Sequence, residues 1–362
     1  MNNGNSLSGR IFLPVVVALL IASCGGGGGN GGGGNNSPTA NNWLIPRGEV
    51  VDGGPGKDGI PAIDQPLFEP ASSIGTVADE YLVIVVRHDG GIKAYPHDIM
   101  NWHEIVNDGP DNSPYTMSYC PLTASAVAWH GNASHAQKRF GVSGLLYNSN
   151  LILYDRETDS NWSQMLQMSV SGPRAGEVPA RIQVIETRLD TLRAMYPNAL
   201  VMTRETSYTR NYDQSPYGPY LINEILLFPV STMDNRLSRK TRVIGIHSDT
   251  DSKVYQIDSF GAATQTINEQ FEGQSIVVVG NTAQNIATIY DRELSDGTIL
   301  TFSPLQDALP NLMSDDEGNV WNVFGTAVSG PRAGEQLGMT RSFTSLWFAW
   351  VAFFPTPQIH FN

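Results

Sequence analysis

The sequence predicts a mainly β fold of the α+β type, with two related β-rich halves from an internal duplication and a few short helices. The heptapeptide SGPRAGE occurs at residues 171–177 and again at 329–335, and each copy follows a tryptophan at nearly the same distance, Trp162 and Trp321. Most other apolar segments are short runs bounded by Gly, Pro, Asn or Asp, which is typical of strands. A long identity repeated at this separation indicates that one structural unit occurs twice.

The first 23 residues are expected to be a lipoprotein signal peptide. Arg10 precedes the apolar run 11–22, which is too short to span a bilayer as a helix. The run ends in Ile-Ala-Ser before Cys24, which resembles a bacterial lipobox, whose cysteine thiol is acylated. Several acyl chains on one residue anchor a protein firmly. Gly25 after the cysteine favours the outer membrane by resemblance to sorted lipoproteins. We therefore expect an envelope protein attached to the membrane through lipidated Cys24; an ordinary secretory signal with an accidental cysteine is the alternative.

Two segments then precede the predicted halves. Residues 24–42 are expected to form a flexible tether, because Gly25 to Asn36 is almost entirely Gly and Asn, which bury no apolar surface. Residues 43–78 are rich in Gly, Pro and Asp and predict an irregular lead-in with little regular structure.

The first half is expected at residues 79–205. The patterns in it predict, in order, a hairpin of 81–86 with 91–95, a helix from Pro96 through Val106, a strand at 115–119, a hairpin of 126–129 with 138–142, more strand at 145–154, and a helix at 187–196.

The connecting loop is expected at residues 206–237 and the second half at 238–362. The connection contains the tyrosine-rich and turn-rich run YTRNYDQSPYGPY at 208–220. In the second half, Lys253 to Tyr255 matches Lys93 to Tyr95, and the strand 275–279 matches 115–119. The closing apolar run LWFAWVAFFP at 346–355 is too short to span a membrane and is expected in the core.

Charge and cysteine content limit the functional classes. The chain has 35 Asp plus Glu against 22 Lys plus Arg, a formal net charge of −13. An acidic surface repels phosphate backbones, so no nucleic-acid partner is expected. The chain has two cysteines. With Cys24 acylated, Cys120 has no partner for an intramolecular disulfide, and an unpaired thiol in an oxidising compartment needs an explanation.

Residues that occur in one half only are the functional candidates. A constant offset places Asn281 opposite Cys120, and nothing in the second half replaces Trp102, His103 and Glu104. Cys120 could be a catalytic nucleophile with His103 as its base and Glu104 to orient the imidazole. A helix beginning after Cys120 would lower the thiol pKa, although the following ASAVAW favours a strand.

The candidate binding residues flank the predicted nucleophile and base. They are Trp102, Tyr119 and Asn107.

Three other interpretations remain open. Cys120 and His103 could bind a soft metal such as copper through thiolate and imidazole, although no metal-binding spacing supports this. Cys120 could instead be a small buried hydrophobe and His103 a hydrogen-bonded helix residue. The chain could also be a non-catalytic envelope module that binds a glycan, peptide or other partner through the loop 208–220. The sequence identifies no cofactor, substrate or small-molecule partner.

Several long motifs resemble an uncharacterised bacterial family, domain-of-unknown-function family 3179. They are NWHEIVND at 101–108, YCPLT at 119–123, FGVSGLLYNSNLILYDRET at 140–158, NWSQ at 161–164, both SGPRAGE copies and LWFAWVAFFP at 346–355. Some members carry a second cysteine where this chain has Thr123, so a CxxC redox or metal site is excluded here. The resemblance implies the architecture and no activity.

Overall fold

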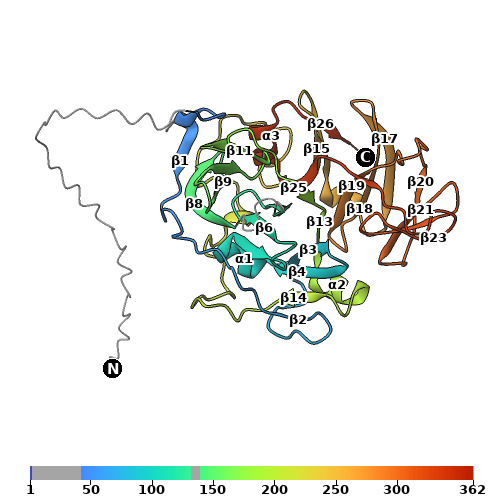
Figure 1. Cartoon of the computed structure of the whole chain (residues 1–362), viewed down its shortest axis with the longest axis horizontal. Helices are drawn as coiled ribbons and strands as arrows, with labels where there is room; N and C mark the ends of the chain where they lie inside the picture. The colour runs from blue at the N-terminus through green and yellow to red at the C-terminus, as the bar shows by residue number, and fades with distance from the viewer. Residues whose placement is uncertain (2–41, 132–138, 362) are drawn as a thin grey trace, which may run out of the picture. The chain divides into compact units, whose positions relative to one another are not determined.

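The computed structural model describes residue 1 and residues 42–131 and 139–361. The predicted signal peptide, Cys24 and most of the tether lie outside the described residues. Residues 40–362 form one compact unit. Strands dominate the described residues and only three α-helices occur in them, so the mainly β prediction is confirmed (Figure 1). The helices are α1 (His97–His103), α2 (Leu189–Met195) and α3 (Trp347–Phe353).

The strands of the first half form three sheets. One has the order β1 (Val50–Asp52), β8 (Phe140–Tyr147), β9 (Asn150–Asp155), β10 (Asn161–Ser163) and β11 (Met168–Ser171). The next has the order β12 (Arg181–Ile182), β7 (Ser125–His130), β6 (Tyr115–Cys120) and β5 (Ile105–Asp108). The third has the order β13 (Val184–Arg188), β3 (Leu82–His88), β4 (Gly91–Pro96), β14 (Leu200–Met202) and β2 (Phe68–Pro70).

The strands of the second half also form three sheets. One has the order β20 (Phe302–Pro304), β21 (Asn311–Asp315), β22 (Val320–Asn322) and β23 (Ala327–Ser329). The next has the order β17 (Gln265–Phe271), β18 (Gln274–Asn281), β19 (Ile286–Asp291) and β24 (Gly338–Met339). The third has the order β25 (Ser342–Leu346), β15 (Arg242–His247), β16 (Ser252–Gln256) and β26 (Gln358–His360).

The order of four strands in each sheet of the first half recurs in the second, and the edge strands β1 and β2 have no counterpart there. For example, β3 and β4 lie between β13 and β14 just as β15 and β16 lie between β25 and β26, and in each case the last pair of strands is parallel. The helix α2 follows β13 as α3 follows β25. This agreement is what a duplication would produce, and it supports that interpretation.

Buried polar contacts recur at corresponding positions as well. Trp162 Nε1 donates to Asp155 Oδ2 at 2.9 Å, and Trp321 Nε1 donates to Asp315 Oδ2 at 2.8 Å. In the SGPRAGE segments, Arg174 binds Glu157 and Glu177, and the second copy's arginine binds Glu317 and Glu335. Both tryptophans are completely buried. These contacts give the repeated residues structural roles: the tryptophans fill cores and the arginines hold turns.

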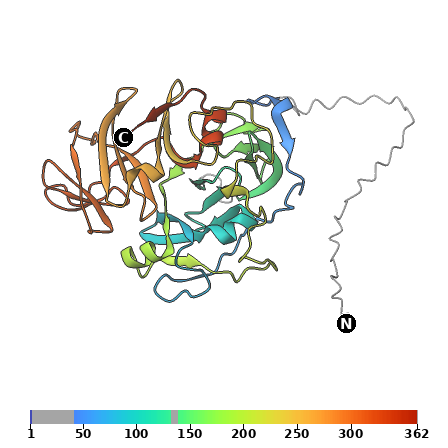
Figure 2. The ribbon, with the colours of Figure 1, turned by 180° about the vertical axis from the view of Figure 1, so that it is seen from behind.

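The two halves share hydrophobic cores. One buried cluster joins Val83 and Leu192 of the first half to Val277 and Trp321 of the second. Another packs Met165 of the first half against the helix α3. Strands of the two halves also contact each other: β25 contacts β7, and β13 contacts β19. Figure 2 shows from behind the green first-half strands against the orange and red second-half strands. Neither half completes its core without the other.

Two local predictions were wrong. The strands expected as a hairpin at 126–129 and 138–142, around a turn at 131–134, do not pair, because β7 lies between β6 and β12 while β8 lies between β1 and β9. Residues 132–138, which include most of the expected turn, lie outside the described residues. The helix expected through Val106 ends at His103, and residues 105–108 form β5 instead.

The other expected elements of the first half are present. They are the hairpin of β3 and β4, the strand β6, and the helix α2. Among described residues, no helix combines the length and apolar composition needed to cross a membrane.

Candidate functional site

The candidate site begins where helix α1 ends. The backbone amide of Glu104 still donates to the Met100 carbonyl at 2.9 Å, but Glu104 itself has φ 58° and ψ −30°. A side chain other than glycine is strained there by on the order of 1–3 kcal/mol. This turn sends the chain straight into β5, where Ile105 and Val106 are both buried. The reversal therefore places His103 and Glu104, two consecutive polar residues, inside the protein.

His103 is buried and both of its ring nitrogens have partners. Nδ1 lies 2.8 Å from the Pro61 carbonyl, to which only a protonated nitrogen can donate, and Nε2 lies 2.7 Å from the Tyr212 hydroxyl. Burial lowers the pKa of His103. The neutral imidazole therefore carries its proton on Nδ1 and accepts at Nε2 from Tyr212.

Glu104 is a buried carboxyl with one side-chain hydrogen-bond donor among the described residues. The Tyr217 hydroxyl donates to its Oε1 at 3.0 Å. Burial raises the pKa of Glu104 to about 7, against the opposing effect of the Tyr217 hydrogen bond. A carboxyl that titrates near neutral pH can both accept and return a proton, which is the property of a general acid or base.

Cys120 is a buried thiol at the end of β6. Its Sγ lies 3.8 Å from the Ser149 carbonyl, a weak contact, and the side chain is 1% exposed. Burial first, and the charge of Glu104 second, raise the pKa of Cys120 to about 11. The residues after it form a turn and then the strand β7, so no helix N-terminus supports a thiolate here. At neutral pH the thiol is protonated.

Helix α1 contacts β6 (Figure 1), and the charge of Glu104 acts on the Cys120 thiol. The backbone amide of Tyr119 donates to the Glu104 carbonyl at 2.8 Å, which places the glutamate beside the last residues of β6. No hydrogen bond between His103 and Cys120 occurs among the described residues. The ionisable group of segment 102–104 that acts on the thiol is therefore Glu104, whereas His103 is bound to Tyr212.

The tyrosine-rich loop covers this site. Its side chains reach back to the segment 102–104 and to the turn after Cys120. The contacts are Trp102 Nε1 to the Gln214 carbonyl at 3.0 Å, Arg210 over the Trp102 ring, Tyr212 to His103, Tyr217 to Glu104, and Tyr220 to the Leu122 carbonyl at 3.1 Å.

The loop residues 208–220, which we call the tyrosine cover, have no α-helix or strand; only a short 3-10 turn, η2 (Tyr220–Ile222), begins at their end. Tyr212 and Tyr220 are buried, whereas Tyr208 is 38% exposed. The cover therefore directs most of its aromatic side chains to the site, leaving few of them on the surface for another partner.

The remaining predicted residues have other surroundings. Asn107 is held inside the protein: its amide donates to Asp64 at 2.7 Å and to the Phe140 carbonyl, and it borders a polar cavity of about 370 Å³. Tyr119 belongs to the hydrophobic cluster on the other face of β6 from Cys120 and stacks at 4.4 Å on His97.

A metal centre gains no support from this arrangement. Among the described residues, no three His, Cys, Asp or Glu side chains lie close enough together to hold a metal ion. The copper site stays an expectation from the sequence.

A buried ionic network, which the sequence did not indicate, lies beyond Tyr119. His97 Nε2 and Arg242 Nη2 lie 3.1 and 3.2 Å from Glu186 Oε2, and the Thr344 hydroxyl donates to Oε1 at 2.6 Å. Burial opposes ionisation of Glu186, but Arg242 and His97 outweigh it and lower its pKa to about 2. Its members are separated along the chain by tens of residues, and no local motif marks them. The network joins the two halves with a permanent carboxylate.

Comparison with known proteins bears on the chain as a whole. The family model described as Protein of unknown function (DUF3179) matches residues 57–357, which is most of the chain. The chain belongs to the DUF3179 family. The searches of curated proteins and of solved structures gave no match. Membership in DUF3179 confirms the family resemblance seen in the motifs and supplies no activity, so the geometry of the site has to support any functional proposal.

Proposed function

We propose that this DUF3179 protein is a thiol-dependent enzyme in which Cys120 is the nucleophile and Glu104 is its proton acceptor. The observation that carries the proposal is Glu104: a buried carboxyl with a strained backbone that titrates near neutral pH and whose charge raises the pKa of the buried Cys120 thiol. Strained, desolvated ionisable groups with a charged or nucleophilic neighbour are typical of active sites.

The covered conformation is a resting state. Moving the proton from a thiol of pKa about 11 to a carboxyl of pKa about 7 is unfavourable by about 5 kcal/mol, since one pKa unit corresponds to 1.36 kcal/mol. Burial is the first cause of both elevated values, so displacement of the tyrosine cover would lower both. A substrate would replace Tyr217 beside Glu104 and reach Cys120 in the same movement.

The surroundings favour an uncharged substrate with an electrophilic carbonyl, such as an ester or thioester. Cys120 belongs to a hydrophobic cluster with Ala62, Ile105 and Leu122, and the charged group that acts on the thiol, Glu104, is an acid, which would repel anions. The Cys120 proton would pass to Glu104 as sulfur attacks the carbonyl carbon. The protonated Glu104 would return it to the leaving group, and water would then release the acyl group from sulfur.

The test separates the role of Glu104 as base from its charge. In Glu104→Gln the thiol loses a neighbouring negative charge, so alkylation of Cys120 by iodoacetamide is expected to become faster. Hydrolysis of a p-nitrophenyl ester is expected to fall at least tenfold in the same variant, because the proton acceptor is gone. Tyr217→Phe tests the cover, with Tyr208→Phe as a matched control whose hydroxyl has no hydrogen bond among the described residues.

Two results would contradict the proposal. Ester hydrolysis that is unchanged in Cys120→Ser would remove the thiol from the chemistry. Alkylation of Cys120 that never exceeds the rate of global unfolding, in the wild type and in both Glu104→Gln and Tyr217→Phe, would make Cys120 a core residue and nothing more.

We also propose that the mature protein is held at the bacterial outer membrane by acyl chains on Cys24. The support is the sequence Ile-Ala-Ser-Cys at the end of the apolar run, followed by a glycine tract. Mass spectrometry of the N-terminal peptide is expected to find a diacylated and N-acylated Cys24. Cys24→Ser is expected to leave the protein in the soluble envelope fraction, and an unmodified Cys24 peptide from wild-type membranes would refute the assignment.

A further inference from the structure

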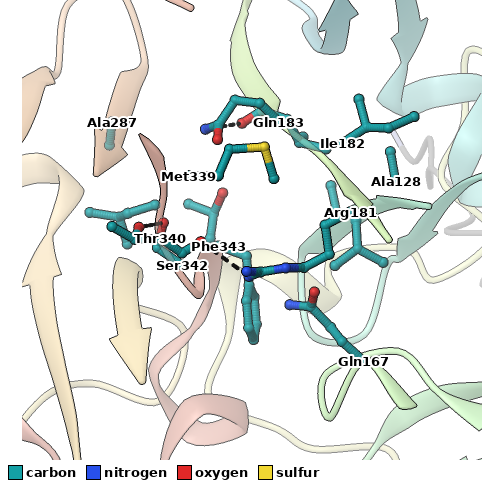
Figure 3. A pocket seen from close by; sticks show the side chains of 15 residues that line it. Ala128, Gln167, Arg181, Ile182, Gln183, Ala287, Met339, Thr340, Ser342 and Phe343 are labelled. Carbon is teal, nitrogen blue, oxygen red and sulfur yellow. Dashed lines mark hydrogen bonds between the residues drawn. The ribbon is translucent and has the colours of Figure 1, made fainter. Parts of the chain in front are cut away.

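A small cavity of about 30 Å³ lies between the two halves, away from the candidate site. Residues of β7 and β12 line it from the first half, and residues from Met339 to Thr344 line it from the second. Its walls are partly apolar, with Ile182, Met339 and Phe343, and partly polar, with Arg181 and Gln167 (Figure 3). A water needs roughly 10–15 Å³ measured in this way, so the cavity holds about two water-sized atoms.

Arg181 is a cation without a matching anion. Its Nη1 donates to the Thr340 carbonyl at 3.1 Å, and none of the ion pairs among the described residues includes it. Burial and the nearby Arg341 lower the pKa of Arg181, which means that its charge is poorly compensated. Arg341, by contrast, is paired with Asp249 at 2.6 Å. The cavity wall therefore carries one positive charge in excess.

Gln167 supplies a second unused polar group. The residue is 7% exposed, and its side-chain amide has no hydrogen-bond partner among the described residues. Gln167 has a positive φ of 53° and lines the cavity. Figure 3 shows the amide beside the guanidinium of Arg181. Neither the Gln167 amide nor the Arg181 guanidinium is paired with a side chain of the described residues, so both can donate to a ligand in the cavity.

We propose that this cavity is a binding site for the carboxylate group of a small monocarboxylic acid. A carboxylate has one negative charge, which matches the single uncompensated cation Arg181. Its two oxygens match the size of the cavity, and they can accept from the guanidinium and from the Gln167 amide together. The alkyl part of the acid would lie against Met339, which is 39% exposed, and Phe343.

Other anions fit less well. Sulfate and phosphate carry four oxygens and up to two charges, which exceeds both the space and the available positive charge. Chloride would pair with Arg181, but a single ion provides no second acceptor atom for the Gln167 amide. The site is separate from Cys120 and Glu104, so it is independent of the proposed thiol chemistry.

The experiment uses acetate as the probe and the full chain as the protein. Saturation-transfer NMR on the acetate methyl group is expected to show saturable binding, with a dissociation constant on the order of millimolar for so few atoms. Arg181→Met is expected to weaken binding at least tenfold. Gln167→Glu places a carboxylate of the protein beside Arg181 and is expected to abolish acetate binding while the protein remains folded.

Arg188→Gln is the matched control, because it removes one positive charge from the same half at an arginine that is paired with Asp190 outside the cavity. It is expected to bind acetate as the wild type does. Equal acetate signals in the wild type, Arg181→Met and Gln167→Glu would overturn the site. Displacement of acetate by chloride or phosphate at lower concentration than acetate itself would overturn the carboxylate assignment.

Discussion

Replacement of Glu104 by glutamine should change the pH dependence of stability by a predictable amount. The pKa of this carboxyl rises from its ordinary 4.5 to about 7 on folding. The folded protein therefore holds the proton more tightly than the unfolded chain does. The stabilising contribution is complete below pH 4.5 and is lost as the pH rises through 7, and it amounts to about 3 kcal/mol. Glutamine does not titrate but keeps an acceptor for Tyr217.

The assay is urea unfolding of wild type and Glu104→Gln at intervals from pH 4 to pH 8.5. The free energy of unfolding of the wild type, relative to the variant, is expected to fall by about 3 kcal/mol between pH 4.5 and pH 7 and to be flat above pH 8. Two parallel profiles across this window would refute the reasoning, because they would mean that Glu104 does not titrate in the folded protein near neutral pH.

Glu186→Gln is the control, because Glu186 is also a buried carboxyl but its pKa is lowered and not raised. The pKa of Glu186 is lowered to about 2, so its titration stabilises the fold above pH 4.5 and that contribution is lost only as the pH falls toward 2. Between pH 5 and pH 8 the difference between wild type and Glu186→Gln is therefore expected to be constant.

Four further substitutions test the packing. Trp162→Phe and Trp321→Phe each remove a hydrogen bond to a buried aspartate and some buried volume, so urea unfolding should show similar losses of about 2–4 kcal/mol for the two; a loss in only one half would contradict equivalent roles. Gly280→Ala should lose about 1–3 kcal/mol, because the new Cβ would lie 2.2 Å from the Phe260 ring, and Phe260→Leu should restore part of it. Tyr212→Phe leaves a buried imidazole nitrogen without its donor and should cost about 1–3 kcal/mol, and an unchanged unfolding midpoint would argue against the cover.

The sequence predicted local elements correctly where the spacing of apolar residues matches the residues that are buried. The strands β3 and β4 and the helix α2 have clear periodicity and clear turn residues at their ends. Pairing between distant strands has no such local signal, which is why the hairpin predicted around residues 131–134 was wrong. The end of α1 was also misplaced, because a glutamate and not a glycine makes the turn, and the buried apolar residues of β5 continue the helical spacing by coincidence.

The candidate site was predictable in part. Trp102, His103, Glu104 and Cys120 stood out because the second half lacks them, and the charge of Glu104 raises the pKa of Cys120. Their partners Tyr212, Tyr217 and Glu186 are remote in sequence, and only the high tyrosine content of the loop hinted at two of them. The elevated pKa of Glu104 follows from burial under that loop, which no property of residues 101–108 reveals.

Strands of the second half contact strands of the first, so the first half can complete its folding only after the second half is present. The amide of Leu346 in β25 donates to the Thr123 carbonyl at 2.8 Å, and β25 lies on β7. A chain that is made or delivered from its N-terminus exposes this face of β7 until nearly its last residues have followed. A product that stops before β25 would leave β7, the strand paired with the Cys120 strand β6, without this contact. Only complete chains should therefore acquire an ordered site, and early release should yield protease-sensitive material.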